Sequence, residues 1–159
     1  MTVFTARTSA EAVVAAPRQA IWDALTDPDT LASLTPFLKR ITPEGDSHWR
    51  WEMTGLDVLP IEVAPVFTEK MDFVELERID FHHDPPAGRT ERTAVTGWYV
   101  LKEVEGGTHL ATSLEIALDL PLPKLSSKVV TTAMRGVIDQ MGDRFSRNLL
   151  DHLGIDPKA

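Results

Sequence analysis

The chain has 159 residues, 43% hydrophobic and 25% charged, which is typical of a folded globular protein and excludes intrinsic disorder. This length predicts a single domain spanning residues 1–159. The formal net charge is −8, with 24 acidic and 16 basic side chains and no block of Lys or Arg. We therefore expect no nucleic-acid partner and no attraction to anionic membrane surfaces.

The chain contains no cysteine, which excludes disulfides, thiolate metal sites and cysteine nucleophiles. Residues 1–16 include Arg7 and Glu11 and lack the apolar core of a signal peptide. No stretch approaches the roughly 18 apolar residues that span a bilayer. We therefore expect a cytoplasmic protein with no membrane insertion.

The first segment alternates with period two between Val3 and Val14, which predicts a strand with one buried face. That face consists of Phe4, Ala6, Thr8, Ala10, Ala12 and Val14. Its small residues leave space above the sheet. Pro17 and the pair Asp27-Pro28 are helix-start signals, and they predict two short helices over about residues 17–35.

The middle of the chain has the patterns of β-strands. Strands are expected at 37–42, 48–53, 61–67, 73–83, 90–104 and 108–120. Pro65 places the third of these on an edge or at a bulge. A change of phase near Glu77 predicts a bulge in the fourth. Turns are expected at Glu44-Gly45-Asp46 and at Glu105-Gly106-Gly107.

A helical pattern runs from about Lys124 to Leu153 and ends at Gly154. One face carries Val130, Met134, Val137, Ile138, Met141, Phe145 and Leu149, at spacings of three and four. About thirty helical residues extend roughly 45 Å, which is enough to cross a whole sheet.

This order of elements resembles the helix-grip fold of the START/Bet v 1-like (SRPBCC) superfamily, in particular its polyketide cyclase/dehydrase branch. The residues that carry the resemblance are Ala16-Pro17-x-x-x-Ile21-Trp22-x-x-Leu25-Thr26-Asp27-Pro28-x-x-Leu31 and Gly106-Gly107-Thr108. It implies an α+β fold: a curved antiparallel sheet of about six or seven strands, two short helices and one long C-terminal helix. Superfamily members include carriers, cyclases, hydroxylase subunits and ligand sensors, so the fold selects no single function.

One helix cannot fill the concave face of a curved sheet completely, and the gap becomes a packed core or an apolar pocket. We expect a cavity between the sheet and the C-terminal helix that binds an apolar small molecule. The residues predicted to line it are Trp51, Phe81, Tyr99, Met134, Ile138, Met141 and Phe145.

Few polar side chains are candidates for chemistry. Tyr99 either hydrogen-bonds a ligand carbonyl or buries its ring with the hydroxyl in water, and the second is favoured. Asn148 either contacts a ligand or, as favoured, anchors the helix to a strand carbonyl. His82 and His83 are neighbours on a strand and point to opposite faces, so they do not share a metal ion. We expect neither a metal nor a cofactor.

Three functions remain open at this point. The favoured one is non-catalytic binding of a lipid-like or polyketide-like molecule. The second is a polyketide cyclase/dehydratase-type enzyme, for which the sequence offers only Tyr99, Asn148 and His83 as proton-transfer groups and assigns none of them a catalytic role. The third is an interaction module with a filled core, which would use an outer-face aromatic residue of the adjacent pair Trp98 and Tyr99. Both a monomer and a homodimer fit the sequence.

Overall fold

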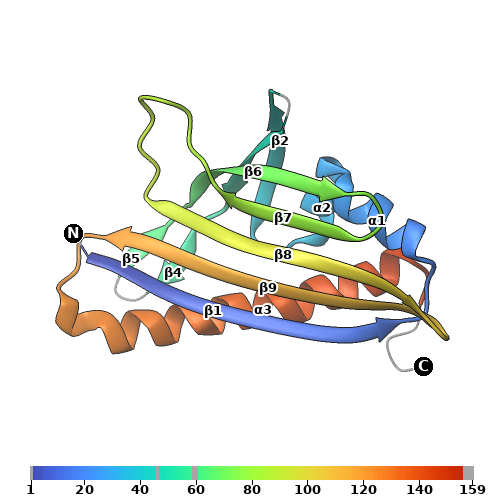
Figure 1. Cartoon of the computed structure of the whole chain (residues 1–159). Coiled ribbons are helices and arrows are strands. Elements are labelled where there is room, and N and C mark those ends of the chain that lie inside the picture. Colours follow the sequence, from blue (N-terminus) through green and yellow to red (C-terminus); the bar gives the residue numbers. More distant parts are fainter. Residues whose placement is uncertain (1, 46, 59–60, 156–159) are drawn as a thin grey trace.

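The computed structural model describes residues 2–45, 47–58 and 61–155 (Figure 1). The strands are β1 (Thr2–Val14), β2 (Leu38–Glu44), β3 (His48–Met53), β4 (Leu56–Val58), β5 (Ile61–Val63), β6 (Val66–Val74), β7 (Arg78–His83), β8 (Thr93–Val104) and β9 (Gly107–Leu120). The helices are α1 (Arg18–Thr26), α2 (Pro28–Leu34), the short 3-10 helix η1 (Lys124–Ser126) and α3 (Ser127–His152).

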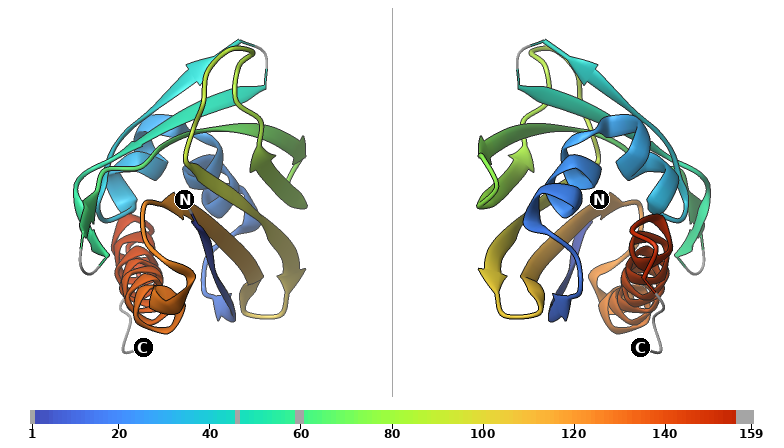
Figure 2. Two further views of the ribbon diagram at one scale, coloured as in Figure 1. Left: turned by 90° about the vertical axis from the view of Figure 1, so that its left-hand side faces the viewer. Right: turned by 90° about the vertical axis from the view of Figure 1, so that its right-hand side faces the viewer.

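Seven strands form one antiparallel sheet in the order β1-β9-β8-β7-β6-β3-β2. The sheet curves around α3, while α1 and α2 lie together at one end of the curve (Figure 2). This arrangement confirms the predicted helix-grip architecture. In the described part of the chain, no helix is both long enough and apolar enough to cross a membrane.

The predicted inner face of β1 is only partly buried. Phe4, Ala6 and Val14 are buried, as the alternation predicts, but Ala10 and Ala12 are exposed. The reason is that Phe4 and Ala6 pack with side chains of α3 and Val14 packs in the main cluster, whereas Ala10 and Ala12 belong to neither group.

The two short helices begin and end where their signals predict. Asp27 caps α2 by accepting hydrogen bonds from the backbone N–H of Asp29 (3.3 Å) and the hydroxyl of Thr30 (2.7 Å). Ile21, Leu25 and Leu31 are buried in the main hydrophobic cluster. The helix pair therefore closes its end of the curved sheet with apolar side chains.

The expected single strand at 61–67 is wrong. β5 ends at Val63 and pairs with β4 in a separate two-stranded sheet, while β6 starts at Val66. Pro65 lies in the break because it has no backbone N–H to donate to a strand ladder. The predicted turn at Glu44-Gly45-Asp46 is supported at Gly45, which has φ of +69°; Asp46 lies outside the described residues.

The expected single strand at 73–83 is also wrong. The change of phase near Glu77 comes from a hairpin turn between β6 and β7, not from a bulge. Leu76 has φ of +64°, and the backbone N–H of Glu77 donates to the carbonyl of Val74 (2.9 Å). A turn and a bulge both invert the alternation, so the pattern alone did not distinguish them.

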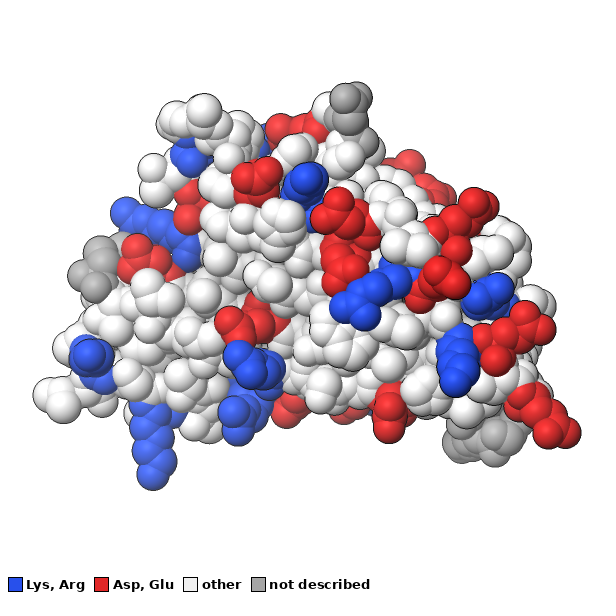
Figure 3. All heavy atoms as spheres, viewed as in Figure 1, with Lys and Arg blue, Asp and Glu red and all other residues white. Residues whose placement is uncertain are grey.

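The outer face of the sheet carries charged side chains of both signs (Figure 3). The half-buried Trp98 lies on this face, and the guanidinium of Arg78 lies 5.3 Å from the centroid of its ring. Arg78 also donates to Asp80 (2.7 Å). The outer aromatic ring is therefore covered in part by its own sheet, through a cation–π contact.

Candidate ligand-binding site

The concave face of the sheet consists of rows of side chains that cross the strands. Because paired residues of antiparallel strands share a face, Tyr99 lies in line with Thr112 on β9 and Ile79 on β7. The next row places Phe81 opposite Gly97. A Cβ atom at Gly97 would lie 2.7 Å from a ring carbon of Phe81, so the glycine makes room for that ring. The Phe81 ring then packs against Tyr99, with 5.8 Å between centroids.

α3 contacts the rest of the fold through two groups of buried side chains, one toward each end. The first group comprises Val130, Met134 and Ile138 with Phe4, Ala6, Leu118 and Leu120. The second comprises Leu149 with Ala24 and Leu34. Met141 lies between these groups along the helix, is half-buried, and belongs to neither group of described residues.

Several apolar side chains that pack against the main cluster remain partly exposed. They include Trp51 on β3, Tyr99 on β8, Leu110, Leu114 and Ile116 on β9, and Phe145 on α3 itself. Each of them packs against the buried main cluster on one side. None of these six side chains, and none of the seven predicted to line the cavity, lines either of the two clefts of about 450 and 580 Å³ in the described part of the chain. Their free apolar surface is therefore what the structure shows, and a cavity enclosed by them stays a prediction.

The seven residues predicted to line the cavity separate into two sets. Trp51, Phe81, Tyr99 and Phe145 all contact the main cluster. Met134 and Ile138 belong to the first half of α3 and pack in its first buried group, and Met141 is the next residue of that helix in the set. Phe81, Met134 and Ile138 are buried to 7%, 2% and 3% exposure, so they offer little free surface. The half-buried members retain surface for a ligand, and their contact with one remains a prediction.

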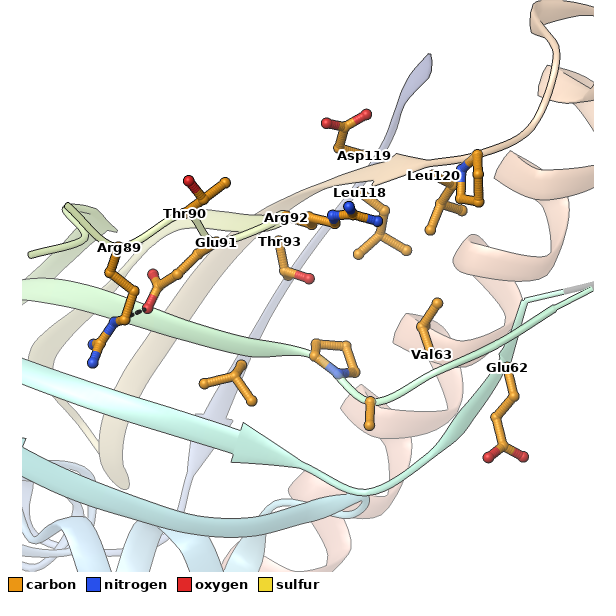
Figure 4. A pocket seen from close by; sticks show the side chains of 14 residues that line it. Glu62, Val63, Arg89, Thr90, Glu91, Arg92, Thr93, Leu118, Asp119 and Leu120 are labelled. Carbon is orange, nitrogen blue, oxygen red and sulfur yellow. Dashed lines mark hydrogen bonds and ion pairs between the residues drawn. The ribbon is translucent and has the colours of Figure 1, made fainter. Parts of the chain in front are cut away.

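A cleft of about 450 Å³ opens at the end of the sheet away from α1 and α2 (Figure 4). Leu118 and Leu120 of β9 point toward Val63 of β5 across it. The same three residues belong to, or pack against, the apolar group under the first half of α3. The cleft therefore ends on the inner apolar surface, and its volume lies within the range of small-molecule sites.

Glu69 is the only acidic or basic residue that is fully buried in the described part of the chain. Its pairing partners are Trp49 on β3 and His83 on β7. Neither carboxyl oxygen has a hydrogen-bond partner among the described residues. Burial, followed by the negative charge of Glu91, raises the pKa of Glu69 to about 9. The carboxyl group is therefore neutral at physiological pH.

Glu91 differs from Glu69 because its carboxylate is fully partnered. It accepts from the backbone N–H and the hydroxyl of Thr68 (both 2.8 Å), and it lies 2.9 Å from Nε2 of His83. Arg89 also donates to it, at 3.2 Å. Burial alone would raise the pKa of Glu91, but the Thr68 and His83 hydrogen bonds and the Arg89 charge outweigh it and lower that pKa. Glu91 thus ties the 84–92 loop to β6.

The other polar side chains considered for chemistry are Tyr99, His82, His83 and Asn148. Burial raises the pKa of Tyr99 to about 12, so its hydroxyl stays protonated. His82 is exposed, while His83 is engaged with Glu91. Asn148 donates to the carbonyl of Leu34 (2.9 Å). It is therefore an anchor, as favoured, but its acceptor ends α2 rather than lying on a strand.

We expect the Asn148→Ala substitution to lower the free energy of unfolding by about 1–2 kcal/mol, because the Leu34 carbonyl loses its side-chain donor. Ligand affinity should stay within about twofold of the wild type. Urea unfolding and dye titration measure the two quantities. Unchanged stability together with lost binding would instead place Asn148 in the cavity.

The comparison with family models covers nearly the whole chain. A model described as "Polyketide cyclase / dehydrase and lipid transport" matches residues 5–150. The chain belongs to this family. The match runs from β1 through most of α3, so it covers every strand and helix in whole or in large part.

Solved structures support the same fold. An aromatase/cyclase, Zhui from Streptomyces sp. R1128, is 14% identical with a TM-score of 0.69, and the match covers 94% of each chain. A START superfamily protein from Mycobacterium smegmatis is 15% identical with a TM-score of 0.65, covering 93% of this chain and 97% of that one. The di-domain aromatase/cyclase StfQ of the steffimycin biosynthetic pathway is 14% identical with a TM-score of 0.68, covering 95% and 51%. No curated protein matches the chain in sequence.

Glu69 is missing from the sequence predictions because the strand there was expected to end at Phe67. The signal is present in the alternation of Phe67, Glu69 and Met71, which places the three side chains on one face once β6 is known to continue to Val74. An acidic residue between two apolar residues of a buried face is the pattern that would have identified it.

Proposed function

We propose that this member of the polyketide cyclase/dehydrase family binds an apolar, lipid-like or polyketide-like small molecule between the sheet and α3, without catalysing a reaction. The observation that carries the proposal is the set of partly exposed apolar side chains on β3, β8, β9 and α3 that pack against the main cluster. Apolar surface enclosed within a fold but not packed is surface that a small molecule can bury.

The composition of this surface supports an adaptable rather than a tightly specific site. Trp51, Tyr99 and Phe145 contribute aromatic rings to this surface, and Met141 on α3 adds a flexible thioether. Methionine fits irregular shapes, and aromatic faces stack on planar or aliphatic guests alike. The cleft beside Val63, Leu118 and Leu120, which Glu62, Arg92 and Asp119 also line, would be the entrance for such a molecule.

The direct test fills the space with a larger side chain. We expect Met141→Trp to weaken binding of the neutral dye N-phenyl-1-naphthylamine at least tenfold, because the indole would occupy the volume that the dye needs. Fluorescence titration measures the affinity, and native mass spectrometry of the purified wild type identifies any retained molecule.

The matched control is Val129→Trp, which adds the same ring to the same helix at a position that is 58% exposed. Its affinity for the dye should stay within about twofold of the wild type. If Met141→Trp bound the dye as tightly as Val129→Trp, or if the wild type bound no apolar probe, the proposal would be wrong.

The buried, protonated Glu69 favours one second candidate, a cyclase/dehydratase-type enzyme. A carboxylic acid with a raised pKa, beside His83 on the same face, has the properties of a proton donor. Under this alternative, Glu69→Gln would abolish conversion of a bound poly-β-ketone substrate while leaving its affinity unchanged. Under the non-catalytic proposal, neither variant nor wild type would convert it.

A further inference from the structure

Glu69 occupies the concave face of the sheet among the residues of the proposed cavity. Residues two apart on a strand share a face, so Glu69 lies on the same side as Phe67 and Met71, which are both in the main cluster. Its pairing with Trp49, a third member of that cluster, gives the same orientation from the neighbouring strand. The carboxyl group therefore lies within the apolar interior.

Trp51 provides a second polar atom at the same place. It pairs with Phe67, whose ring it stacks on with 5.9 Å between centroids and 12° between planes. Trp51 and Glu69 are thus diagonal neighbours on one face, a spacing that long side chains bridge. The indole Nε1 of Trp51 is buried and, like both oxygens of Glu69, bonds to no described residue.

Two unpartnered polar groups side by side in an apolar interior do not serve stability. A buried donor or acceptor without a partner costs the desolvation of that group and returns nothing to the fold. Other buried polar groups are satisfied: Thr108, for example, donates to the carbonyl of Ala16 (2.9 Å). Among the described residues the one other buried side-chain atom without a hydrogen bond is Nε of Arg50, and that guanidinium lies 4.0 Å from the carboxylates of Glu44 and Glu52. The exception at Glu69 and Trp51 points to a group that arrives with the ligand.

The protonation state of Glu69 decides which ligand group fits. The charged or titratable groups closest to it in the fold are His83 on the same face and, from the 84–92 loop, Glu91 and Arg89. Glu91 is ionised and disfavours a second negative charge, so Glu69 keeps its proton. A protonated carboxyl and an indole N–H both donate, and one carbonyl oxygen has two lone pairs to accept them.

We infer that Glu69 and Trp51 together bind a carbonyl oxygen of the ligand, so that the site selects oxygenated apolar molecules, ketones in particular, over hydrocarbons of the same shape. This inference rests on the proposed function, because it assigns a polar end to the same cavity. A carboxylate ligand is disfavoured, since its charge would enter the apolar interior beside Glu91.

The test uses two probes that differ in one oxygen: 2-acetylnaphthalene and 2-ethylnaphthalene, titrated by displacement of N-phenyl-1-naphthylamine. We expect the wild type to bind the ketone about tenfold more tightly than the hydrocarbon, the ratio that one net hydrogen bond supplies. Glu69→Leu should bind both within about twofold of each other and keep the wild-type affinity for the hydrocarbon.

Two further variants separate hydrogen bonding from general effects. Glu69→Gln retains an N–H donor and should keep most of the ketone preference, also at pH 10, where the wild type loses it as Glu69 ionises. Glu115→Leu is the matched control, because Glu115 bonds to Arg7 on the outer surface. It should leave the preference unchanged.

The possible results distinguish the two proposals. If wild type and Glu69→Leu both bind the two probes equally well, the inference is overturned while the cavity stands, and Glu69 is satisfied by water only. If the wild type binds neither probe nor the dye, the proposed function itself is wrong and the inference is lost with it.

Discussion

Glu69→Gln should stabilise the protein at neutral pH, by roughly 3 kcal/mol at pH 7, because the unfolded wild type gains free energy by ionising its glutamate and the folded wild type does not. The ordinary pKa of 4.5 applies in the unfolded chain, and burial raises the pKa to about 9 in the fold. Between these values the folded state holds one proton more than the unfolded state. Wild-type stability therefore falls as pH rises, by about 1.4 kcal/mol per pH unit.

The sign of this dependence makes the prediction specific. Below pH 4.5 both states are protonated, and the difference between Glu69→Gln and wild type should be small. It should grow from pH 5 to pH 9 and level off above that, where the folded wild type ionises as well. Guanidinium unfolding at pH 5, 7 and 9 measures it, and Glu115→Gln is the control at the surface. A difference that does not change with pH would show that Glu69 has the same protonation state in both conformations.

The predicted loss of stability caused by Glu69 suggests that this side chain is kept for a function. On this prediction, the chain carries a glutamate at position 69 where glutamine would be more stable at neutral pH. Stability and activity commonly conflict at residues that a ligand or a reaction requires. The stability measurement and the ketone-preference measurement therefore examine one residue from two sides, and they can fail independently.

The elements predicted best from the sequence are those with long uninterrupted patterns. The C-terminal helix spans about seven turns of regular apolar spacing, so the polar Asn148 did not hide the helical pattern. The Asp27-Pro28 signal placed the start of α2 correctly because capping is local chemistry. Such signals do not depend on the rest of the fold, and for this reason they remain readable in a single sequence.

The middle of the chain was less predictable because β4 and β5 are only three residues long and the turn between β6 and β7 contains no glycine. Leu76 occupies a positive-φ position that glycine usually takes, so the turn between β6 and β7 carried no signal. Glu69 was missed for a different reason: it lies between the predicted strands 61–67 and 73–83, in the part of β6 that was not expected to be a strand. The aromatic residues of the concave face could be identified from the sequence, whereas the buried position of Glu69 depended on where one strand ended.

The second large expected effect on stability concerns Gly107, in the Gly106-Gly107-Thr108 motif that carried part of the family resemblance. Gly107 has φ of +145°, and a Cβ atom there would overlap the backbone carbonyl oxygen of Val14. The clash involves backbone, which cannot rotate away as a side chain would. Thr108 next to it donates to the carbonyl of Ala16 (2.9 Å), so the hairpin is fastened to the segment that leads from β1 into α1.

We therefore expect Gly107→Ala to lower the free energy of unfolding by about 3–5 kcal/mol, combining backbone strain with overlap of packed atoms. Gly106→Ala is the matched control: its φ is +88°, but a Cβ atom there meets nothing within 4 Å, so only the left-handed conformation is penalised, by about 1–2 kcal/mol. In thermal unfolding, the midpoint temperature of Gly107→Ala should lie at least about 6 °C below that of the wild type. Because α1 and α2 close the interior at this end, the loss of hairpin contact should also weaken dye binding at temperatures well below that midpoint. Equal effects of the two alanines would mean that the positive φ alone, and not the contact with β1, fixes the glycine at position 107.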